Sequence, residues 1–142
     1  MKTLGTCFCL LMLATLMVGC GKAKEPWEIV YPVEGVLNLG GKPLAGASIT
    51  LIPQDPDVPT TVRPTGRSRD DGTFSLGTYS TEDGAPVGDY KVLVLRFPVI
   101  VTASNAVSGP NDLPKKYASV QTTDLTLTVN SDEVELQPLE LN

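Results

Sequence analysis

Residues 67–76 read RSRDDGTFSL, and this stretch decides the fold because it predicts two strands joined by a tight turn. The dipeptide Asp71-Gly72 supplies the positive φ that a hairpin turn needs. Residues 67–69 lead into the turn, and residues 73–76 leave it as strand-forming sequence. We therefore expect the strands on either side of the turn to pair antiparallel.

Short strands separated by turn residues continue in both directions from this hairpin. Before it, Ile49 and Leu51 fall on one face of a strand and Thr50 on the other. Stretches rich in proline, glycine or asparagine are expected to be irregular loops, and they cover residues 53–66 and 98–120. The expected strands cover residues 33–39, 47–51, 67–69, 73–76, 90–97, 125–129 and 134–136.

The strand over residues 90–97 is the most apolar of the set. Leu93 and Leu95 accompany Val92 and Val94, so apolar side chains point to both faces. Strands of this kind are usually covered on both sides. We therefore expect this strand at the centre of its sheet.

The strand pattern leaves almost no sequence for helices, because no amphipathic segment of ten or more residues is present. About seven short strands with regularly spaced turns are typical of two antiparallel sheets packed face to face. The sequence therefore predicts an all-β protein, a seven-stranded antiparallel β-sandwich.

Five short motifs in a fixed order resemble those of small bacterial lipoproteins that carry a carboxypeptidase regulatory-like domain. They are VEGV (33–36), GKPLAGA (41–47), DDGTF (70–74), DGAPVGDYKV (83–92) and LPKKY (113–117). The resemblance implies a transthyretin-like (prealbumin-like) fold of the Ig-like class over residues 33–142, without catalytic residues of its own. The motifs say least about the loops at 53–66 and 97–113.

The N-terminal residues are expected to be a cleaved signal segment. The apolar run Leu4–Val18 would span roughly 22 Å as a helix, short of the ~30 Å hydrocarbon core of a bilayer. Together with Gly19 and Cys20, it resembles a bacterial lipoprotein signal peptide over residues 1–19, whose cysteine is acylated and becomes the first mature residue. Residues 20–32 would then be a lipidated tether. An ordinary secretory signal or an uncleaved anchor is the alternative.

Lipidation at Cys20 would fix the location of the protein. Each buried methylene contributes about 0.8 kcal/mol, so several acyl chains such as palmitate hold a protein stably on a bilayer. We expect membrane lipid as a partner, and a location on the extracytoplasmic side of the cell membrane or outer membrane. Gly21, where an aspartate would favour retention in the inner membrane, slightly favours the outer membrane.

Charge and composition exclude several functional classes. Of 11 basic residues, cleavage after residue 19 removes only Lys2 and no acidic residue, so 10 remain against 16 acidic ones. A net acidic chain repels phosphate backbones, which argues against a nucleic-acid partner. The chain has no histidine and, after cleavage, no cysteine besides Cys20. Histidine-based nucleophiles, the commonest zinc ligand and internal disulfides are therefore excluded, and we expect neither an enzyme nor a cofactor.

Carboxylate pairs are the remaining route to catalysis or metal binding. They occur at residues 55 and 57, 70 and 71, 82 and 83, and 132 and 133. All lie in expected turns or loops, where acidic side chains are normally solvated. Arginines occupy two ligand positions of the EF-type calcium loop that would end at Asp71-Gly72. No catalytic or metal residue is assigned, and a cation shared between loops stays open.

Six side chains are candidates for ligand contact. They are Arg63, Arg67, Arg69, Trp27, Tyr79 and Tyr117. The arginines could grip an anionic glycan or a partner's carboxylates, or form a charged strand edge that discourages edge pairing. The aromatic rings could stack on sugars, or pack as caps of the sandwich.

Together these features predict a non-enzymatic, membrane-anchored lipoprotein that serves as an interaction or structural module of the cell envelope, with an envelope protein or polysaccharide as partner. The alternative is a carbohydrate- or small-ligand-binding module that uses loops 53–66 and 97–113. An enzyme based on loop carboxylates is the third hypothesis.

Overall fold

The computed structural model describes residues 22–131 and 136–142, so the expected signal segment, Cys20 and the start of the strand expected at 134–136 lie outside the described residues. Within that range, no helix has the length and apolar content needed to cross a membrane. The strands are β1 (Glu34–Leu39), β2 (Lys42–Pro43), β3 (Ser48–Pro53), β4 (Thr65–Arg67), β5 (Thr73–Gly77), β6 (Gly88–Leu95), β7 (Val99–Val101), β8 (Ala106–Ser108), β9 (Thr126–Val129) and β10 (Leu136–Leu141). Two 3₁₀ helices, η1 (Pro26–Glu28) and η2 (Lys115–Ala118), accompany them.

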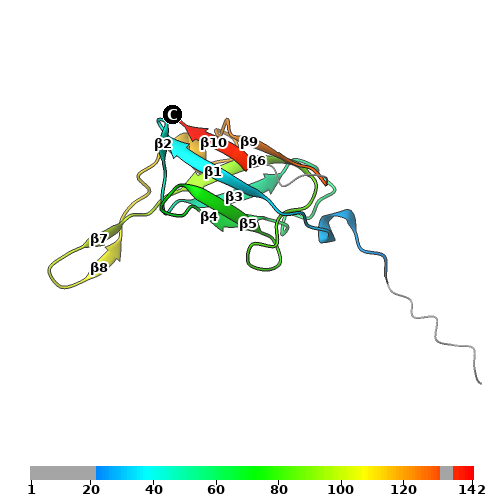
Figure 1. The fold of residues 1–142 in the computed structure, drawn as a ribbon, viewed down its shortest axis with the longest axis horizontal. Coiled ribbons are helices and arrows are strands. Elements are labelled where there is room, and N and C mark those ends of the chain that lie inside the picture. The colour runs from blue at the N-terminus through cyan, green and yellow to red at the C-terminus, as the bar shows by residue number, and fades with distance from the viewer. Residues whose placement is uncertain (1–21, 132–135) are drawn as a thin grey trace, which may run out of the picture.

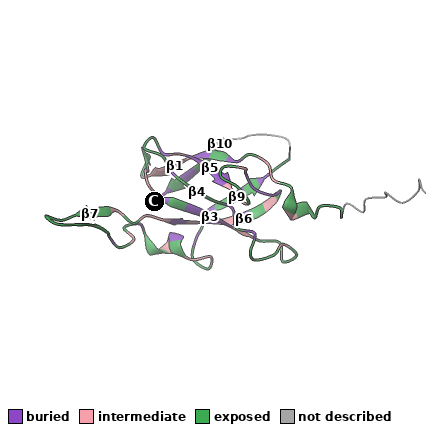
Figure 2. Ribbon diagram, turned by 90° about the horizontal axis from the view of Figure 1, so that it is seen from below, coloured by how far each residue is buried: buried purple, intermediate pink, exposed green. Residues whose placement is uncertain are grey.

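One curled sheet contains eight of these strands. Its order is β10-β1-β5-β4-β3-β6-β9, with β2 paired to β1. The curl lays β1, β5 and β10 over β3 and β6 as in a half-barrel, and strands of both layers carry buried residues (Figure 1, Figure 2). β7 and β8 form a small second sheet. The predicted all-β class is therefore confirmed.

The arrangement of the strands differs from the expected seven-stranded antiparallel sandwich in two respects. β4 pairs with β5, so the two layers belong to one continuous sheet and are not separate. β10 pairs with β1 in parallel, whereas the other pairings are antiparallel. The β4–β5 hairpin has a local turn signal, but its two strands join the two layers through β3 and β1, which lie further away in the chain. Those pairings, like the pairing of β1 with β10, have no local signal in the sequence.

The hairpin predicted at residues 67–76 is present as β4 and β5, but its first strand covers Thr65–Arg67 instead of 67–69. Arg69 donates its backbone N–H to the carbonyl of Thr73 at 2.7 Å, and Gly72 donates to the carbonyl of Arg69 at 2.9 Å. Gly72 has φ of +82°, the conformation that the Asp-Gly dipeptide was expected to supply.

The core lies between the two layers and follows the predicted alternation. Ile49 and Leu51 of β3 are fully buried, while Thr50 between them is only half-buried. The other strands add Leu37, Phe74, Leu76, Tyr90, Val92, Val94, Leu127, Val129, Leu139 and Leu141, and connecting segments add Val33, Leu44, Ala47, Ala85, Leu113, Tyr117 and Leu125.

The prediction for residues 90–97 is confirmed in part. The strand is β6, which lies between β3 and β9 in the sheet. Val92 and Val94 face the core and are fully buried, but Leu93 and Leu95 are only half-buried. The outer face of β6, which carries Leu93 and Leu95, is therefore only partly covered, and no second layer of the protein packs on it within the described residues.

The long connection expected at residues 98–120 contains regular structure. β-branched residues of β7 pair antiparallel with β8, with Ile100 opposite Val107, and η2 follows. The proline and glycine residues that suggested an irregular loop flank this hairpin instead of interrupting it. Residues 53–66 are irregular as expected until β4 begins at Thr65.

Candidate functional site

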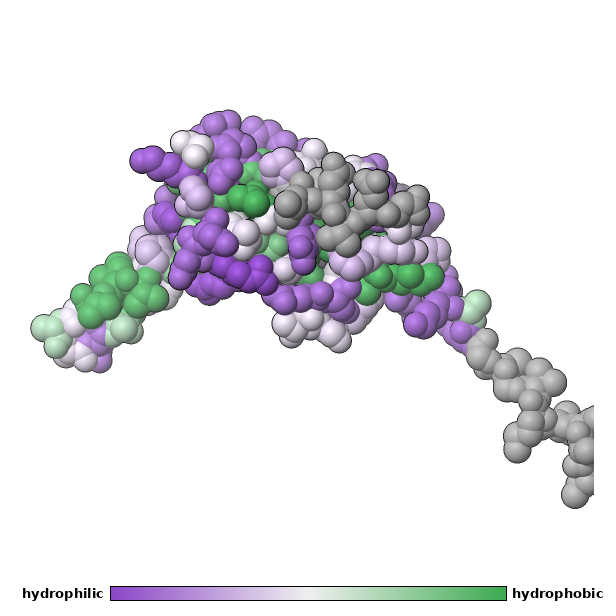
Figure 3. All heavy atoms as spheres, viewed as in Figure 1, coloured by the Kyte–Doolittle hydropathy of each residue, from purple (hydrophilic) through white to green (hydrophobic). Residues whose placement is uncertain are grey.

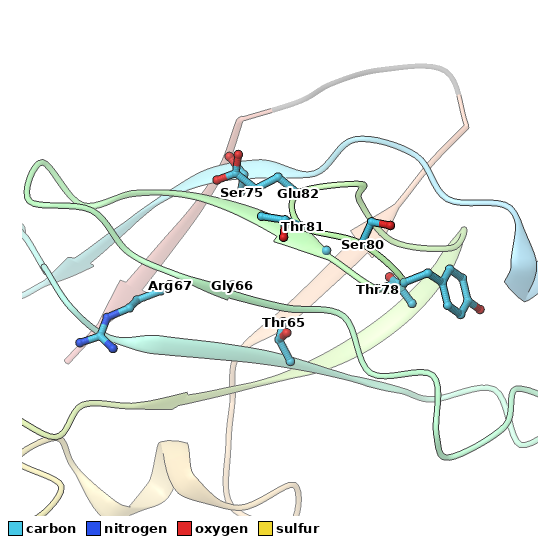
Figure 4. Close-up of a pocket in the computed structure, with 10 residues that line it drawn as sticks. Thr65, Gly66, Arg67, Ser75, Thr78, Ser80, Thr81 and Glu82 are labelled. Atoms are coloured by element: carbon cyan, nitrogen blue, oxygen red, sulfur yellow. The ribbon is translucent and has the colours of Figure 1, made fainter.

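A polar groove of about 570 Å³ lies on the outer face of β4 and β5, under the loop that follows β5 (Figure 4). This β4–β5 groove is lined by Thr65, Gly66, Arg67, Ser75, Gly77, Thr78, Tyr79, Ser80, Thr81 and Glu82. Its walls therefore come from two paired strands and one short loop.

The floor of the groove follows from strand alternation. Phe74 and Leu76 of β5 point into the core, so Ser75 and Gly77 between and after them point outward. Gly77 presents no side chain to the groove, and the loop folds back closely over it, because a Cβ at this position would lie 2.2 Å from the carbonyl oxygen of Ser80. Glycine at position 77 thus gives the groove its shape.

The loop over the groove is organised by one carboxylate. Asp83 accepts backbone N–H groups from Thr78 at 2.6 Å, Tyr79 at 3.2 Å and Ser80 at 2.9 Å. The hydroxyl of Thr78 donates to the carbonyl of Gly84 at 2.7 Å. These bonds fix the backbone of the loop and leave its outward side chains available.

An ion pair ties the loop to the hairpin turn. Arg69 lies 2.5 Å from the carboxylate of Glu82 and also donates to the hydroxyl of Ser75 at 3.1 Å. Both ionic side chains are about half exposed, so the pair adds little stability. Its main effect is geometric, because it positions Glu82, whose φ of +57° is unusual for a residue with a side chain.

Tyr79 connects the groove to the N-terminal tether. Its hydroxyl donates to the backbone carbonyl of Trp27 in η1 at 2.5 Å. Burial raises the pKa of Tyr79, and the carboxylates of Glu28 and Asp83 raise it further, so the hydroxyl stays protonated as a donor. The side chain is 54% exposed, which leaves ring surface open beside the groove.

Several polar groups in the groove have no protein partner. Within the described residues, the guanidinium of Arg67 and the hydroxyls of Thr65, Ser80 and Thr81 form no hydrogen bond or ion pair. A charged donor fork and three hydroxyls that both donate and accept are therefore free to bind a ligand.

The structure brings four of the six predicted contact residues together. Arg67 and Tyr79 line the groove, Arg69 lies beside it through Glu82, and Trp27 is bonded to Tyr79. The sequence singled out the arginines and aromatic rings but not the hydroxyl residues. A cluster of serine and threonine over residues 78–81 was the available signal, and it also fits an ordinary turn.

The other two candidates lie elsewhere. Arg63 lines a separate hollow of about 170 Å³ in the 53–66 loop, where its Nε donates to the carbonyl of Thr60 at 2.9 Å. Tyr117 is 1% exposed in the core, and its hydroxyl bonds to the backbone of Asn142. Its ring therefore offers no open face to a sugar, and it packs as the cap that the sequence left as the alternative.

The carboxylate pairs that the structure describes take part in local turns. Asp55 accepts the backbone N–H of Asp57 at 2.9 Å. Asp71 accepts the hydroxyl of Thr73 at 2.6 Å, and this bond contributes most to lowering the pKa of that carboxyl. Across residues 22–131 and 136–142, no three acidic, cysteine or histidine side chains lie close enough to hold a metal ion. The pair at 132 and 133 lies outside the described residues.

Comparisons with known proteins give only distant matches. No family model matches the chain, and no curated protein matches it. One solved structure is of a Pseudomonas aeruginosa "putative carbohydrate binding protein", with 14% identity, a TM-score of 0.47, and coverage of 83% of this chain and 92% of that one. Another is a 9R-lipoxygenase from Cyanothece, with 18% identity, a TM-score of 0.37, and coverage of 82% of this chain and 16% of that one. Similarities this small assign neither a family nor a function.

Proposed function

We propose that this protein is a non-enzymatic carbohydrate-binding module of the cell envelope, held on a membrane by lipid at Cys20, and that the β4–β5 groove is its binding site. One observation carries the proposal. An unpaired guanidinium, three unpaired hydroxyls and an exposed tyrosine ring belong to residues that line one groove, and hydrogen bonds fix the backbone of the loop above it.

The chemistry of the groove suits an oligosaccharide. Sugar hydroxyls both donate and accept hydrogen bonds, as do the side chains of Thr65, Ser80 and Thr81. The ring of Tyr79 offers an apolar face for the C–H side of a pyranose. The positive charge of Arg67 favours a sugar that carries a carboxylate, because such pairs form bidentate hydrogen bonds.

Binding without catalysis is the better interpretation of the groove. Glycoside hydrolysis needs two carboxyl groups, typically about 5–10 Å apart across the ligand. Glu82 is the carboxylate among the lining residues, and it is paired with Arg69. Asp83 is occupied by three backbone N–H groups.

The lipid anchor and the carboxypeptidase regulatory-like domain are the parts of the proposal that rest on sequence. If Cys20 is acylated, the seven residue-to-residue steps from it to Trp27 span at most about 25 Å. Since Trp27 is bonded to Tyr79, the rim of the groove would lie within that reach of the membrane. The proposed ligand is then a polysaccharide of the same envelope.

Ligand binding is tested on residues 20–142 with Cys20→Ser, which retain every described element. A panel of neutral and uronic-acid oligosaccharides is screened by melting temperature, because a ligand that binds the native state stabilises it. We expect stabilisation by an acidic oligosaccharide, and Arg67→Ala should weaken binding by about tenfold or more. Arg63→Ala is the matched control, since Arg63 lies in the separate hollow. A panel without any stabilising sugar, or equal affinity in both variants, would contradict the proposal.

The anchor is tested separately on the full chain made in a bacterial host. We expect intact-mass analysis to show a mature protein that begins at an acylated Cys20, and Cys20→Ser should release the protein from the membrane fraction. A mass that retains residues 1–19 without lipid would contradict the anchor but leave the groove proposal standing.

A further inference from the structure

The hairpin of β7 and β8 projects from the body of the molecule. This arm, residues 97–109, lies at the opposite end of the long axis from η1 (Figure 1). Figure 3 shows hydrophobic residues gathered on the arm, in contrast to the mostly polar surface of the body beside it. The arm is therefore a separate surface from the β4–β5 groove.

The base of the arm is held firmly. Arg96 donates from Nε and Nη2 to the two carboxylate oxygens of Asp112, at 2.9 and 2.8 Å. The backbone N–H of Arg96 also donates to the side chain of Asn111 at 3.0 Å. At the far end, Thr102 donates its N–H to the carbonyl of Asn105 at 2.7 Å. The arm is thus hydrogen-bonded at its base and at its turn.

The surface of the arm is unusually apolar for an exposed segment. Val99 is 68% exposed and Val101 is 78% exposed. Residues 97–111 contain no charged side chain. Within the described residues, neither β7 nor β8 pairs with any further strand. Uncharged strands with open edges and exposed valines are features of an interaction surface.

A bilayer is a poor partner for this arm. Its tip, residues 102–105, reads TASN, so the most protruding part is polar while the valines lie behind it. The open backbone edges of a two-stranded ribbon would also lose their hydrogen bonds to water in hydrocarbon, at a cost of several kcal/mol per group.

The arm is complementary to itself. Val99 lies opposite Ser108, and Val101 lies opposite Ala106, and directly paired residues share one face of a ribbon. That face therefore has large side chains along β7 and small ones along β8. A two-fold axis close to the direction of the arm, inclined so that the two bodies clear each other, would place β7 of one copy over β8 of the other, so that valines meet small residues in both directions.

We propose that the β7–β8 arm binds the same arm of a second copy of this chain, through the face that carries Val99 and Val101. With the axis close to the direction of the arm, both η1 helices point the same way, so two copies attached to one membrane through the proposed lipid anchors can pair. The contact is smaller than a standard interface and is weak in solution. When two copies are tethered to the same membrane, the effective concentration of one arm near the other rises to about the millimolar range.

The two bodies would lie side by side in this dimer, and each carries a net negative charge. Salt screens repulsion between exposed charges and does not weaken apolar contact. Association through the arm should therefore strengthen as salt is raised, whereas association driven by opposite charges would weaken.

The test is sedimentation of residues 20–142 with Cys20→Ser at concentrations up to about 1 mM, the range that a short tether provides. We expect reversible dimers that Val101→Asp weakens at least tenfold. Val87→Asp is the matched control, because Val87 is also exposed, at 50%, but lies outside the arm. Raising sodium chloride from about 0.01 to about 1 M shortens the Debye length from about 30 to about 3 Å and should increase the dimer fraction.

Other outcomes overturn the proposal. A monomer across the whole concentration range, both in solution and when held on nickel-lipid vesicles through an N-terminal histidine tag, would exclude self-association. Equal dimerisation of the Val101→Asp and Val87→Asp variants would place the contact elsewhere. Binding of the untagged chain to protein-free phosphatidylcholine vesicles that is lost in Val101→Asp would assign the arm to lipid instead.

Discussion

The two hairpins β4–β5 and β7–β8 share a local design but differ in their surroundings. β4 and β5 have further partners, β3 and β1, so one face of β5 packs on the core and the other carries a polar groove. β7 and β8 pair with each other alone within the described chain, and their valines face solvent. The first hairpin therefore stabilises the fold and carries the groove proposed as the ligand site, while the second contributes little to the core and carries the surface proposed for self-association.

The largest expected difference between the hairpins concerns their apolar side chains. Phe74 of β5 is 1% exposed, whereas Ile100 of β7 is 46% exposed. Phe74→Ala should lower the free energy of unfolding by about 3–5 kcal/mol, because it leaves a cavity in the core. Ile100→Ala should change it by less than about 1 kcal/mol. Urea denaturation measures both, and similar losses would show that the arm packs as part of the core.

Glycine substitutions sharpen the same contrast. A Cβ on Gly66 of β4 would lie 2.4 Å from the carbonyl oxygen of Ser75, a severe clash, whereas one on Gly109 would lie 3.0 Å from the side-chain end of Ile100 and 3.1 Å from the carbonyl oxygen of Pro98. Backbone cannot move aside as easily as a side chain, so Gly66→Ala should destabilise by about 2–3 kcal/mol and Gly109→Ala by about 1 kcal/mol or less. The melting temperatures of the two variants show which substitution destabilises the protein more. A larger decrease in Gly109→Ala than in Gly66→Ala would contradict the prediction.

A smaller effect is expected from the loop over the groove. Asp83→Ala removes the acceptor of three backbone N–H groups, and partly exposed donors then bond to water, at a cost of about 1–2 kcal/mol. Glycan affinity should fall by more than stability suggests, because the loop that carries Tyr79 and Ser80 loses its fixed shape. Asp83→Asn retains one acceptor oxygen, so its stability and its glycan affinity should lie between those of the unmodified protein and Asp83→Ala. Calorimetry measures the glycan affinity of each variant. Unchanged affinity in Asp83→Ala would show that the loop does not contribute to the binding site.

The smallest expected effect concerns acid pH at the base of the arm. Hydrogen bonds from Arg96 lower the pKa of Asp112, and the positive charge of Arg96 adds to this. Because the folded pKa is below the unfolded value, this contribution is present above about pH 4 and is lost as pH falls through the lower folded pKa. Asp112→Asn should cost at most about 1 kcal/mol at neutral pH, and less at an acid pH below the folded pKa of Asp112. Hydrogen exchange of the arm amides at both pH values measures how much stability the arm loses in Asp112→Asn. An equal loss of stability at both pH values would exclude the ion pair as the cause.

Much of the first hairpin was predictable because its information is local. Asp71-Gly72 specifies the turn, and the buried side chains of Phe74 and Leu76 alternate with polar neighbours. The arm was missed because prolines and glycines flank a strand of three residues, too short for an alternation to be recognised. The parallel pairing of β1 and β10 was missed because about a hundred residues separate the two strands and no local signal records their contact.

The groove was predictable only in part. Arg67, Arg69 and Tyr79 drew attention by their chemistry, but the sequence could not show that a loop brings Tyr79 over the strand that holds Arg67. The sequence also could not show that Tyr117 is buried whereas Tyr79 is exposed. Burial of an isolated tyrosine depends on the packing of distant segments, which no single stretch of sequence encodes.

The parallel pairing of β1 with β10 has a consequence for how the molecule reaches its folded state. β1 is among the first structured segments to emerge during synthesis or export, yet one of its edges has no neighbour until β10 arrives. Contacts between such distant segments slow folding, because a long loop must close before they form. If the chain is exported as proposed, it can complete its sheet only after β10 has left the secretion pore, and until then β1 keeps one edge open for pairing with another strand.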